Sequence, residues 1–223
     1  MAGTVISEKG IIYNSLEKVL RNMGCNVTQE IKESWYGQEK KKVLVDTLYD
    51  MDTKDTQWRD LKYLYKKAEI ELENELTKNY FENGEIKVID ESIFDFFANL
   101  RINGVKVALN TGYNSRLQKQ IIEHVGLKGC IDDYISSDMC KFGRPYPYMI
   151  HKLMERNNIY NVQGVAKVGD TINDMWEGKN AGVGMRIAVL SGAETRMKLF
   201  PHADVIVNKV TDLQNDDLPV FLL

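Results

Sequence analysis

From about Gly104 onward, the chain alternates between short apolar runs rich in β-branched residues and segments with helical periodicity. Strands are expected over 105–110, 133–137, 165–169, 186–190 and 204–207, and helices through Leu117 to Val125, over 146–158 and from Asn173 to Ala181. A strand followed by a helix and then by a further strand forms a right-handed crossover, which makes the strands parallel. The alternation therefore predicts an α/β fold in which helices cover both faces of a parallel sheet.

The segment from Ile11 to about Tyr80 has a different pattern, with helical periodicity and no strand signals. Its last part, from Asp55 to Tyr80, places apolar residues at spacings of three and four, which is typical of an amphipathic helix that packs one stripe. A helical block ahead of the strand–helix alternation indicates a separate lobe.

Composition excludes several classes of protein. Of the 223 residues, 43% are hydrophobic, enough for a sizeable core in one large domain or in a core with a second lobe. A net charge of -3 argues against a nucleic-acid partner, because such proteins carry a clustered basic face. No apolar run approaches the roughly 20 residues of a membrane helix, and the first ten residues lack the apolar part of a signal peptide. The three cysteines, Cys25, Cys130 and Cys140, show no metal-site spacing, so reduced thiols in a cytoplasmic protein are expected.

Two carboxylates mark the end of the strand expected at 165–169. In VGDTINDM (168–175), Asp170 follows the strand directly and Asp174 lies four residues further on. This pair suits Mg²⁺, which prefers oxygen ligands and few protein contacts. The alternative is structural, because Asp170 or Thr171 can cap the next helix and Asp174 suits its first turn. The two roles are compatible.

Two further loops carry groups that suit an anion. In ALNTGYN (108–114), Thr111 lies at a strand tip and Gly112 lets a ligand approach the backbone, although a Thr or Asn that caps a helix has the same pattern. In GRPYPYM (143–149), Arg144 precedes Pro145, which is expected to open the next helix at its first turn. A guanidinium fixed there can hold a phosphate. The alternative is a solvent-exposed loop arginine.

In this order, the three motifs resemble those of the haloacid dehalogenase (HAD) superfamily. KVALNTGYN, GRPYPYM and KVGDTINDMWEGKNAG are similar to phosphonoacetaldehyde hydrolases and phosphonatase-like hydrolases, and an arginine before Pro145, where most HAD phosphatases have lysine, marks this branch. The resemblance implies a Rossmann-like HAD core formed by residues 1–9 and 83–223, with an inserted all-α cap domain at residues 10–82.

The first motif of this family reads Asp-x-Ala-Gly-Thr, and its Asp attacks phosphorus to form an aspartyl phosphate. Residues 1–4, Met-Ala-Gly-Thr, match all but the Asp, so the resemblance places the nucleophile, and the strand that ends in it, immediately upstream of Met1. The resemblance implies that Mg²⁺ binds the carbonyl of Ala2, Asp170, and Asp174 directly or through a water. The implied catalytic residues are Thr111, which binds phosphoryl oxygens, and Arg144, which neutralises them. The implied substrate-binding residues are Gly3, Thr4, Gly112 and Tyr113.

The resemblance also implies a role for a lysine. Most HAD phosphatases carry a second Asp as general acid and base where this chain has Ala2, and phosphonatases instead use a cap lysine that forms a Schiff base with the substrate aldehyde. YGQEKKKVL (36–44) resembles the family's Met-Gly-x-x-Lys stretch, which places Lys40 in that catalytic position. This chemistry requires a pKa lowered by burial or charge. The alternative is a solvated helix face over residues 39–42.

Three positions depart from true phosphonatases. Tyr36 and Val43 replace a Met and a His around the lysine, and Gly10 stands near the place of a Cys. A Mg²⁺-dependent phosphonatase-like hydrolase that acts on a small phosphorylated or phosphonate metabolite is therefore expected. True phosphonoacetaldehyde hydrolysis with Lys40 as Schiff base is one alternative. A truncated, inactive relative that binds phosphate or a partner is another. The family also implies a homodimer through the cap as one option.

Overall fold

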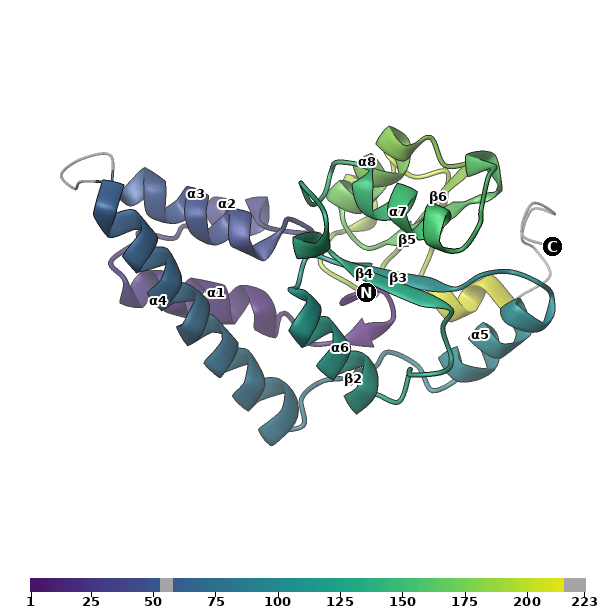
Figure 1. Cartoon of the computed structure of the whole chain (residues 1–223), viewed down its shortest axis with the longest axis horizontal. Coiled ribbons are helices and arrows are strands. Elements are labelled where there is room, and N and C mark those ends of the chain that lie inside the picture. The colour runs from purple at the N-terminus through teal and green to yellow at the C-terminus, as the bar shows by residue number, and fades with distance from the viewer. Residues whose placement is uncertain (53–57, 215–223) are drawn as a thin grey trace.

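After a short first strand, the chain forms a helical segment. The computed structural model describes residues 1–52 and 58–214. The helices of this segment are α1 (Ile11–Asn22), α2 (Gln29–Ser34), α3 (Lys40–Asp52) and α4 (Trp58–Thr77), and α4 continues into a π-helical turn, η1 (Lys78–Glu82). α4 packs against both α1 and α3, and together they extend to one side of the sheet (Figure 1). The long helix expected up to Tyr80 is present, whereas its expected start at Asp55 lies outside the described residues.

The strands form parallel ladders at the carboxyl-terminal side of the chain. β3 (Ala108–Thr111) pairs with β4 (Asp133–Ser136), and β5 (Ala166–Gly169), β6 (Met185–Val189) and β7 (Val205–Val207) pair in that order. The α/β fold with a Rossmann-like parallel sheet is therefore confirmed. β3 is shorter than the predicted 105–110 run, because the N–H of Val107 donates to the carboxylate of Asp132 at 2.9 Å instead of extending the ladder.

An antiparallel pair that the sequence did not predict joins the two ends of the helical segment. β1 (Ile6–Ser7) pairs with β2 (Lys87–Val88). Because these strands lie just before α1 and just after η1, the chain leaves and re-enters the sheet region at one place. The helical cap is thus attached through two neighbouring linkers.

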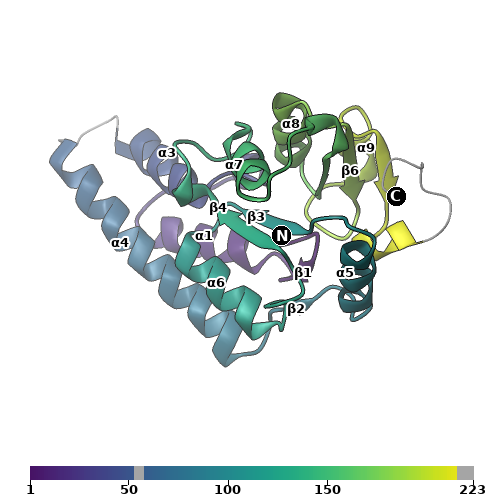
Figure 2. The ribbon, with the colours of Figure 1, turned by 45° about the vertical axis from the view of Figure 1, so that its right-hand side comes forward.

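Helices cover both sides of the strands. They are α5 (Ile93–Ile102), α6 (Ser115–His124), α7 (Tyr148–Arg156), α8 (Ile172–Ala181) and α9 (Arg196–Leu199). In both views, α7 and α8 lie on one side of β3 and β4, and α6 lies on the other (Figures 1 and 2). The prediction that Pro145 opens α7 is wrong: Pro145 lies in a turn closed by the Tyr146 N–H and the Gly143 carbonyl, and α7 begins only at Tyr148.

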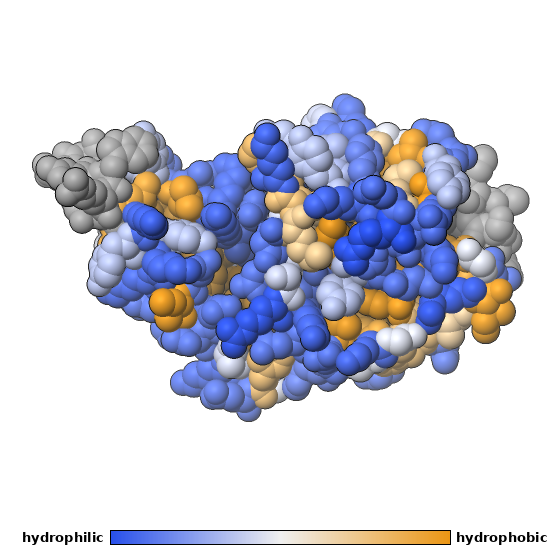
Figure 3. Space-filling model, in the orientation of Figure 1, coloured by the Kyte–Doolittle hydropathy of each residue, from blue (hydrophilic) through white to orange (hydrophobic). Residues whose placement is uncertain are grey.

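One large hydrophobic cluster connects the cap with the sheet. It includes Leu16 and Leu48 from the cap helices together with Ile121 from α6 and Ile187 from β6, all fully buried. The outer face shown in Figure 3 is largely hydrophilic, with small apolar areas between polar ones. Within residues 1–52 and 58–214, no helix is both long and apolar enough to span a bilayer.

Candidate active site

Two carboxylates lie at the carboxyl end of β5. Asp170 follows Gly169, the last residue of the strand, and Asp174 lies in the first turn of α8; both are buried. The hydroxyl of Thr171 accepts the Asp174 N–H at 3.2 Å and donates to Asp174 Oδ2 at 2.6 Å. Thr171 therefore caps the helix, and the carboxylate of Asp170 takes no part in the cap.

Two buried cations compensate Asp174. Arg144 Nη1 donates to Asp174 Oδ1, and Lys167 Nζ lies 2.9 Å from the same oxygen. Burial alone would raise the pKa of Asp174, but Arg144 and Lys167 hold it well below its usual range. The alternative of a solvent-exposed loop arginine is wrong, because only 7% of Arg144 is exposed.

Three residues of this network, Lys167, Asn110 and Glu177, were not predicted from the sequence. Lys167 on β5 lies 2.8 Å from both Glu177 Oε2 and Asn110 Oδ1, and Asn110 Nδ2 donates to both oxygens of Glu177 at 3.0 and 2.9 Å. Arg144 Nε lies 4.0 Å from Glu177 Oε2 and has no hydrogen-bond partner among the described residues. A lysine inside the buried strand and a glutamate one turn after Asp174 were the signals available in the sequence.

Asp170 is enclosed by the N-terminal turn and by the loop after β6. Its Oδ1 accepts the Thr4 hydroxyl at 3.1 Å, and its Oδ2 accepts the Ala193 N–H at 2.9 Å. Gly3 has a φ of +74°, and a Cβ there would lie 2.2 Å from Asp170 Oδ2, so only glycine allows this approach. Burial, followed by the charge of Asp174, raises the pKa of Asp170.

The amino group of Met1 lies within the same network. It donates to the carbonyl of Asn110 on β3 at 3.4 Å. The nitrogen is buried, and the charges of Asp174, Arg144, Lys167 and Asp170 act on it. The first residue is therefore placed beside β3 and within the field of the charges at the end of β5.

Thr111 and its neighbours form the loop after β3. The Thr111 hydroxyl accepts the Tyr113 N–H at 3.3 Å, and Asn114 caps α6 by accepting the Leu117 N–H at 2.8 Å. The capping role thus falls to Asn114, which leaves Thr111 buried at the strand end. Tyr113 is also buried, and its hydroxyl lies 2.8 Å from the hydroxyl of Tyr80.

Residues 36–40 of the cap lie directly over these core loops. The Lys40 N–H donates to the Gly112 carbonyl at 3.2 Å, and Asn173 Nδ2 donates to the Tyr36 carbonyl at 2.7 Å. Gly37 has a φ of +70°, and a Cβ there would lie 2.2 Å from Thr171 Oγ1. Any larger residue at position 37 would push the cap away from the β5 loop.

Lys40 differs from the lysines that follow it. Its side chain is half-buried with Nζ 4.7 Å from the centre of the Tyr13 ring, whereas Lys41 and Lys42 are exposed. Burial, and then the charge of Arg144, lower the pKa of Lys40 from its ordinary value of 10.5 to about 8. The solvated-face alternative therefore applies to Lys41 and Lys42 and not to Lys40.

The donors at this edge of the sheet suit Mg²⁺. Among residues 1–52 and 58–214, no group of three or more His, Cys, Asp or Glu side chains surrounds one point. Mg²⁺ nevertheless usually keeps several waters and binds through one or two carboxylates, and Asp170 and Asp174 meet that requirement. Because burial and Asp174 raise the pKa of Asp170, a nearby cation would stabilise its ionised form.

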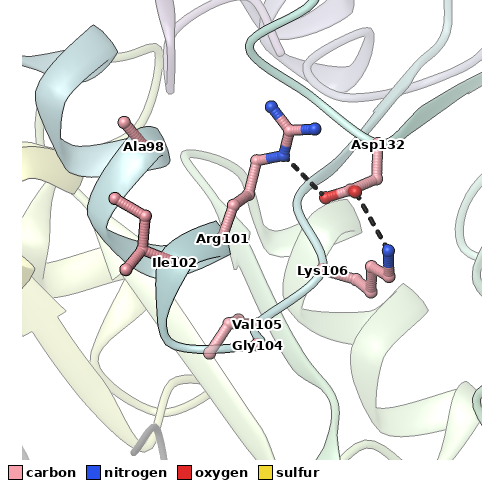
Figure 4. A pocket seen from close by; sticks show the side chains of 7 residues that line it. All are labelled: Ala98, Arg101, Ile102, Gly104, Val105, Lys106 and Asp132. Atoms are coloured by element: carbon pink, nitrogen blue, oxygen red, sulfur yellow. Dashed lines mark hydrogen bonds and ion pairs between the residues drawn. The ribbon is translucent and has the colours of Figure 1, made fainter.

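A hollow at the opposite end of β3 is not part of this site. Arg101 and Lys106 line it, and both already pair with Asp132, at 3.3 and 3.2 Å (Figure 4). The Asp132 carboxylate offsets one of these two positive charges, and both cations are exposed to solvent, which weakens their attraction for an anion. Among the described residues that line the hollow, Asp132 is the only carboxylate, which is too few to hold a metal.

The fold and the site define an α/β core with a helical cap over the carboxyl ends of its strands. A model of the haloacid dehalogenase-like hydrolases matches residues 1–182. The chain belongs to this family.

Individual relatives agree with this assignment. Phosphonoacetaldehyde hydrolase of Bacillus cereus strain G9842 is 33% identical over 105 residues, which cover 47% of this chain and 40% of that protein. The corresponding protein of Bacillus thuringiensis strain Al Hakam is 33% identical over 101 residues, 45% of this chain and 38% of that one. These matches therefore span less than half the length of the relatives.

Solved structures share the fold. A phosphonoacetaldehyde hydrolase-like protein from Oleispira antarctica has a TM-score of 0.79 at 20% identity and covers 96% of this chain and 87% of its own. β-Phosphoglucomutase from Clostridium difficile has a TM-score of 0.76 at 16% identity, with 95% and 89% covered. At these identities the similarity supports the fold alone.

Replacement of Lys167 tests the buried network. We expect Lys167→Met to lower the free energy of unfolding by ~3–5 kcal/mol, because it leaves Asp174 and Glu177 with one cation fewer in a buried site. Urea denaturation measures the change. Lys42→Met is the matched control, since the exposed Lys42–Asp46 pair contributes ~0–1 kcal/mol. Equal stability of the two variants would contradict the expected role of Lys167.

Proposed function

We propose that this protein is a Mg²⁺-dependent phosphonatase-like hydrolase that acts on a small phosphorylated or phosphonate metabolite. One observation carries the proposal: Thr4, Arg144, Asp170 and Asp174, from three segments far apart in sequence, meet in one buried cluster. Membership of the hydrolase family gives independent support.

The nucleophile in this proposal is an aspartate bonded to the nitrogen of Met1. That nitrogen lies in the field of Arg144, Lys167 and the two carboxylates, so a residue attached to it would enter the site. In-line attack of its carboxylate on phosphorus would break the bond to the leaving group and form an aspartyl phosphate, which water then hydrolyses.

Other residues of the chain would neutralise charge, bind the phosphoryl group and exclude water. Arg144, with Lys167 behind it, offsets the negative charge that two carboxylates and a phosphoryl group bring to one place. The hydroxyl of Thr111, which accepts the Tyr113 N–H and keeps its own hydrogen, would donate to a phosphoryl oxygen. The cap residues 36–40 would exclude water from the reacting group.

Asp170, Asp174 and the carbonyl of Ala2 would hold the metal. When bound, Mg²⁺ would polarise the phosphoryl oxygens and shield them from the anionic nucleophile. The hydrogen bonds from Thr4 and Ala193 hold the Asp170 carboxylate in place for that role.

Asp170→Asn tests the metal role. In the chain encoded with its upstream codons, we expect this change to lower kcat/KM for p-nitrophenyl phosphate by more than about 100-fold, because a ligand should cost more than the outer-shell groups that support it. Release of p-nitrophenol in the presence of Mg²⁺ measures the rate.

Two controls accompany this measurement. Asp95→Asn, on the exposed side of α5, should leave the rate unchanged. The nucleotide sequence upstream of the Met1 codon should encode an in-frame strand that ends in Asp. Full activity of Asp170→Asn would rule out the metal role, and an in-frame stop codon would favour a binding protein without turnover.

A second candidate function is hydrolysis of the carbon–phosphorus bond of phosphonoacetaldehyde. The observation that favours it is the half-buried Lys40, whose pKa is lowered to about 8 beside the site. The Lys40 nitrogen would attack the aldehyde carbon, and loss of water would give a protonated imine. The aspartate carboxylate would attack phosphorus while the imine accepts the electron pair of the breaking carbon–phosphorus bond and becomes an enamine. Protonation of the enamine carbon and hydrolysis of the resulting imine would release acetaldehyde and regenerate Lys40, and water would hydrolyse the aspartyl phosphate.

Reductive trapping tests this candidate. With phosphonoacetaldehyde and borohydride, we expect a secondary amine at Lys40, formed at a rate that rises with pH through about 8 because the neutral amine is the reacting form. Tandem mass spectrometry locates the adduct. Lys41 and Lys42, which are exposed to solvent, are internal controls and should not form the adduct. Absence of an adduct at Lys40 would dispose of the Schiff-base role and leave the hydrolase proposal intact.

A further inference from the structure

A glutamate that none of the roles above uses is buried where the first linker enters the cap. Glu8 lies between β1 and α1 and is 6% exposed. Its Oε2 accepts two hydrogen bonds, from the N–H of Ile12 at 2.7 Å and from the hydroxyl of Tyr80 at 2.8 Å. Burying a carboxylate is costly unless its hydrogen bonds are satisfied, so this arrangement calls for a reason.

Tyr80 connects this glutamate to the core. It lies in η1, the π-helical turn of the second linker, and its hydroxyl is 2.8 Å from that of Tyr113 in the loop after β3. π-Helical turns are rare and frequently occur at functional sites. The chain Glu8–Tyr80–Tyr113 therefore ties both cap linkers to the loop that carries Thr111.

Lys40 makes two contacts that lie next to residues held by the Glu8–Tyr80–Tyr113 series of hydrogen bonds. The Lys40 N–H donates to the carbonyl of Gly112, the residue before Tyr113. Its Nζ lies over the ring of Tyr13, the residue after Ile12. Glu8 thus fixes, directly through Ile12 and indirectly through Tyr80, the two surfaces against which Lys40 lies.

We propose that Glu8 is a positioning residue for Lys40, which acts with Tyr80 to hold the amine over the phosphoryl site. The inference rests on the proposed role of Lys40. It adds a residue that the motifs do not contain, together with a partner on the opposite linker.

The surrounding charges predict the direction in which the pKa of Lys40 should change when Glu8 is altered. Glu8 is influenced by Lys40 and Asp170 and bonded to Tyr80, and burial raises its pKa to about 7. Lys40 is influenced by Arg144, Glu8, Asp170 and Asp174, and the charge of Glu8 raises the pKa of Lys40 against the lowering effect of burial. Loss of the charge and loss of the hydrogen bonds therefore move the pKa of Lys40 in opposite directions.

Trace acetylation of the full chain with acetic anhydride, as a function of pH, measures these changes. Tandem mass spectrometry separates Lys40 from its neighbours Lys41 and Lys42, which serve as internal references. In Glu8→Gln, the amide oxygen can still accept both hydrogen bonds but the charge is gone, so the midpoint for Lys40 should move below that of the wild type. The reaction at pH 7 should become faster, by about fivefold if the midpoint falls from about pH 8 to about pH 7.

Removal of the hydrogen bonds should have the opposite effect. Tyr80→Phe keeps the charge of Glu8 but removes its hydrogen bond and releases the surfaces around Lys40. The midpoint for Lys40 should therefore move up toward its ordinary value of 10.5, and its reaction at pH 7 should slow by up to about 300-fold. The exposed pair Glu85→Gln and Tyr63→Phe should change nothing.

The possible outcomes separate this inference from the proposed function. Midpoints that move in opposite directions in Glu8→Gln and Tyr80→Phe would support the positioning role. A wild-type midpoint near 8 that stays fixed in every Glu8 and Tyr80 variant would overturn it and leave the role of Lys40 intact. If wild-type Lys40 is acetylated with the same pH profile as Lys41, both the positioning role of Glu8 and the proposed role of Lys40 are contradicted.

Discussion

The rest of the site depends on one buried set of opposite charges contributed by β5, α8 and the loop before α7. Arg144 and Lys167 face Asp174 and Glu177 with almost no exposure to solvent. Removing one member of a buried pair leaves an uncompensated charge, which is strongly destabilising, so each segment that contributes a member is constrained by the others. This constraint holds the loop before α7 against α8 and keeps the buried Asp174 ionised.

The cap completes the enclosure through short polar contacts and not through a broad hydrophobic face alone. Residues 36–40 contact the loop after β3 and the start of α8, where Gly37 leaves no room for a side chain. The same segment places Lys40 where the charges of Arg144, Asp170 and Asp174 act on its amine. Two linkers fastened by β1, β2 and the Glu8–Tyr80 hydrogen bond determine where that segment lies.

The sequence predicted what local patterns encode. Alternating strands and helices were sufficient for the parallel α/β core, and the spacing of Asp170 and Asp174 located the edge of the sheet. The start of α7 was mispredicted because Pro145 belongs to a turn, which its dipeptide pattern does not distinguish from a helix start. The Glu8–Tyr80 and Tyr80–Tyr113 contacts could not be predicted, because they join residues 72 and 33 positions apart and no periodicity records such pairs.

A crystal structure of the protein grown with Mg²⁺ and tungstate, an oxyanion that mimics a phosphoryl group, is the most direct measurement. If the separated loops form one site for a cation and an oxyanion, tungstate will lie within hydrogen-bonding distance of Thr111 and Arg144, with the metal between it and Asp170. Tungstate bound only in the surface hollow at Arg101 and Lys106, with neither ion near Asp170, would contradict that conclusion.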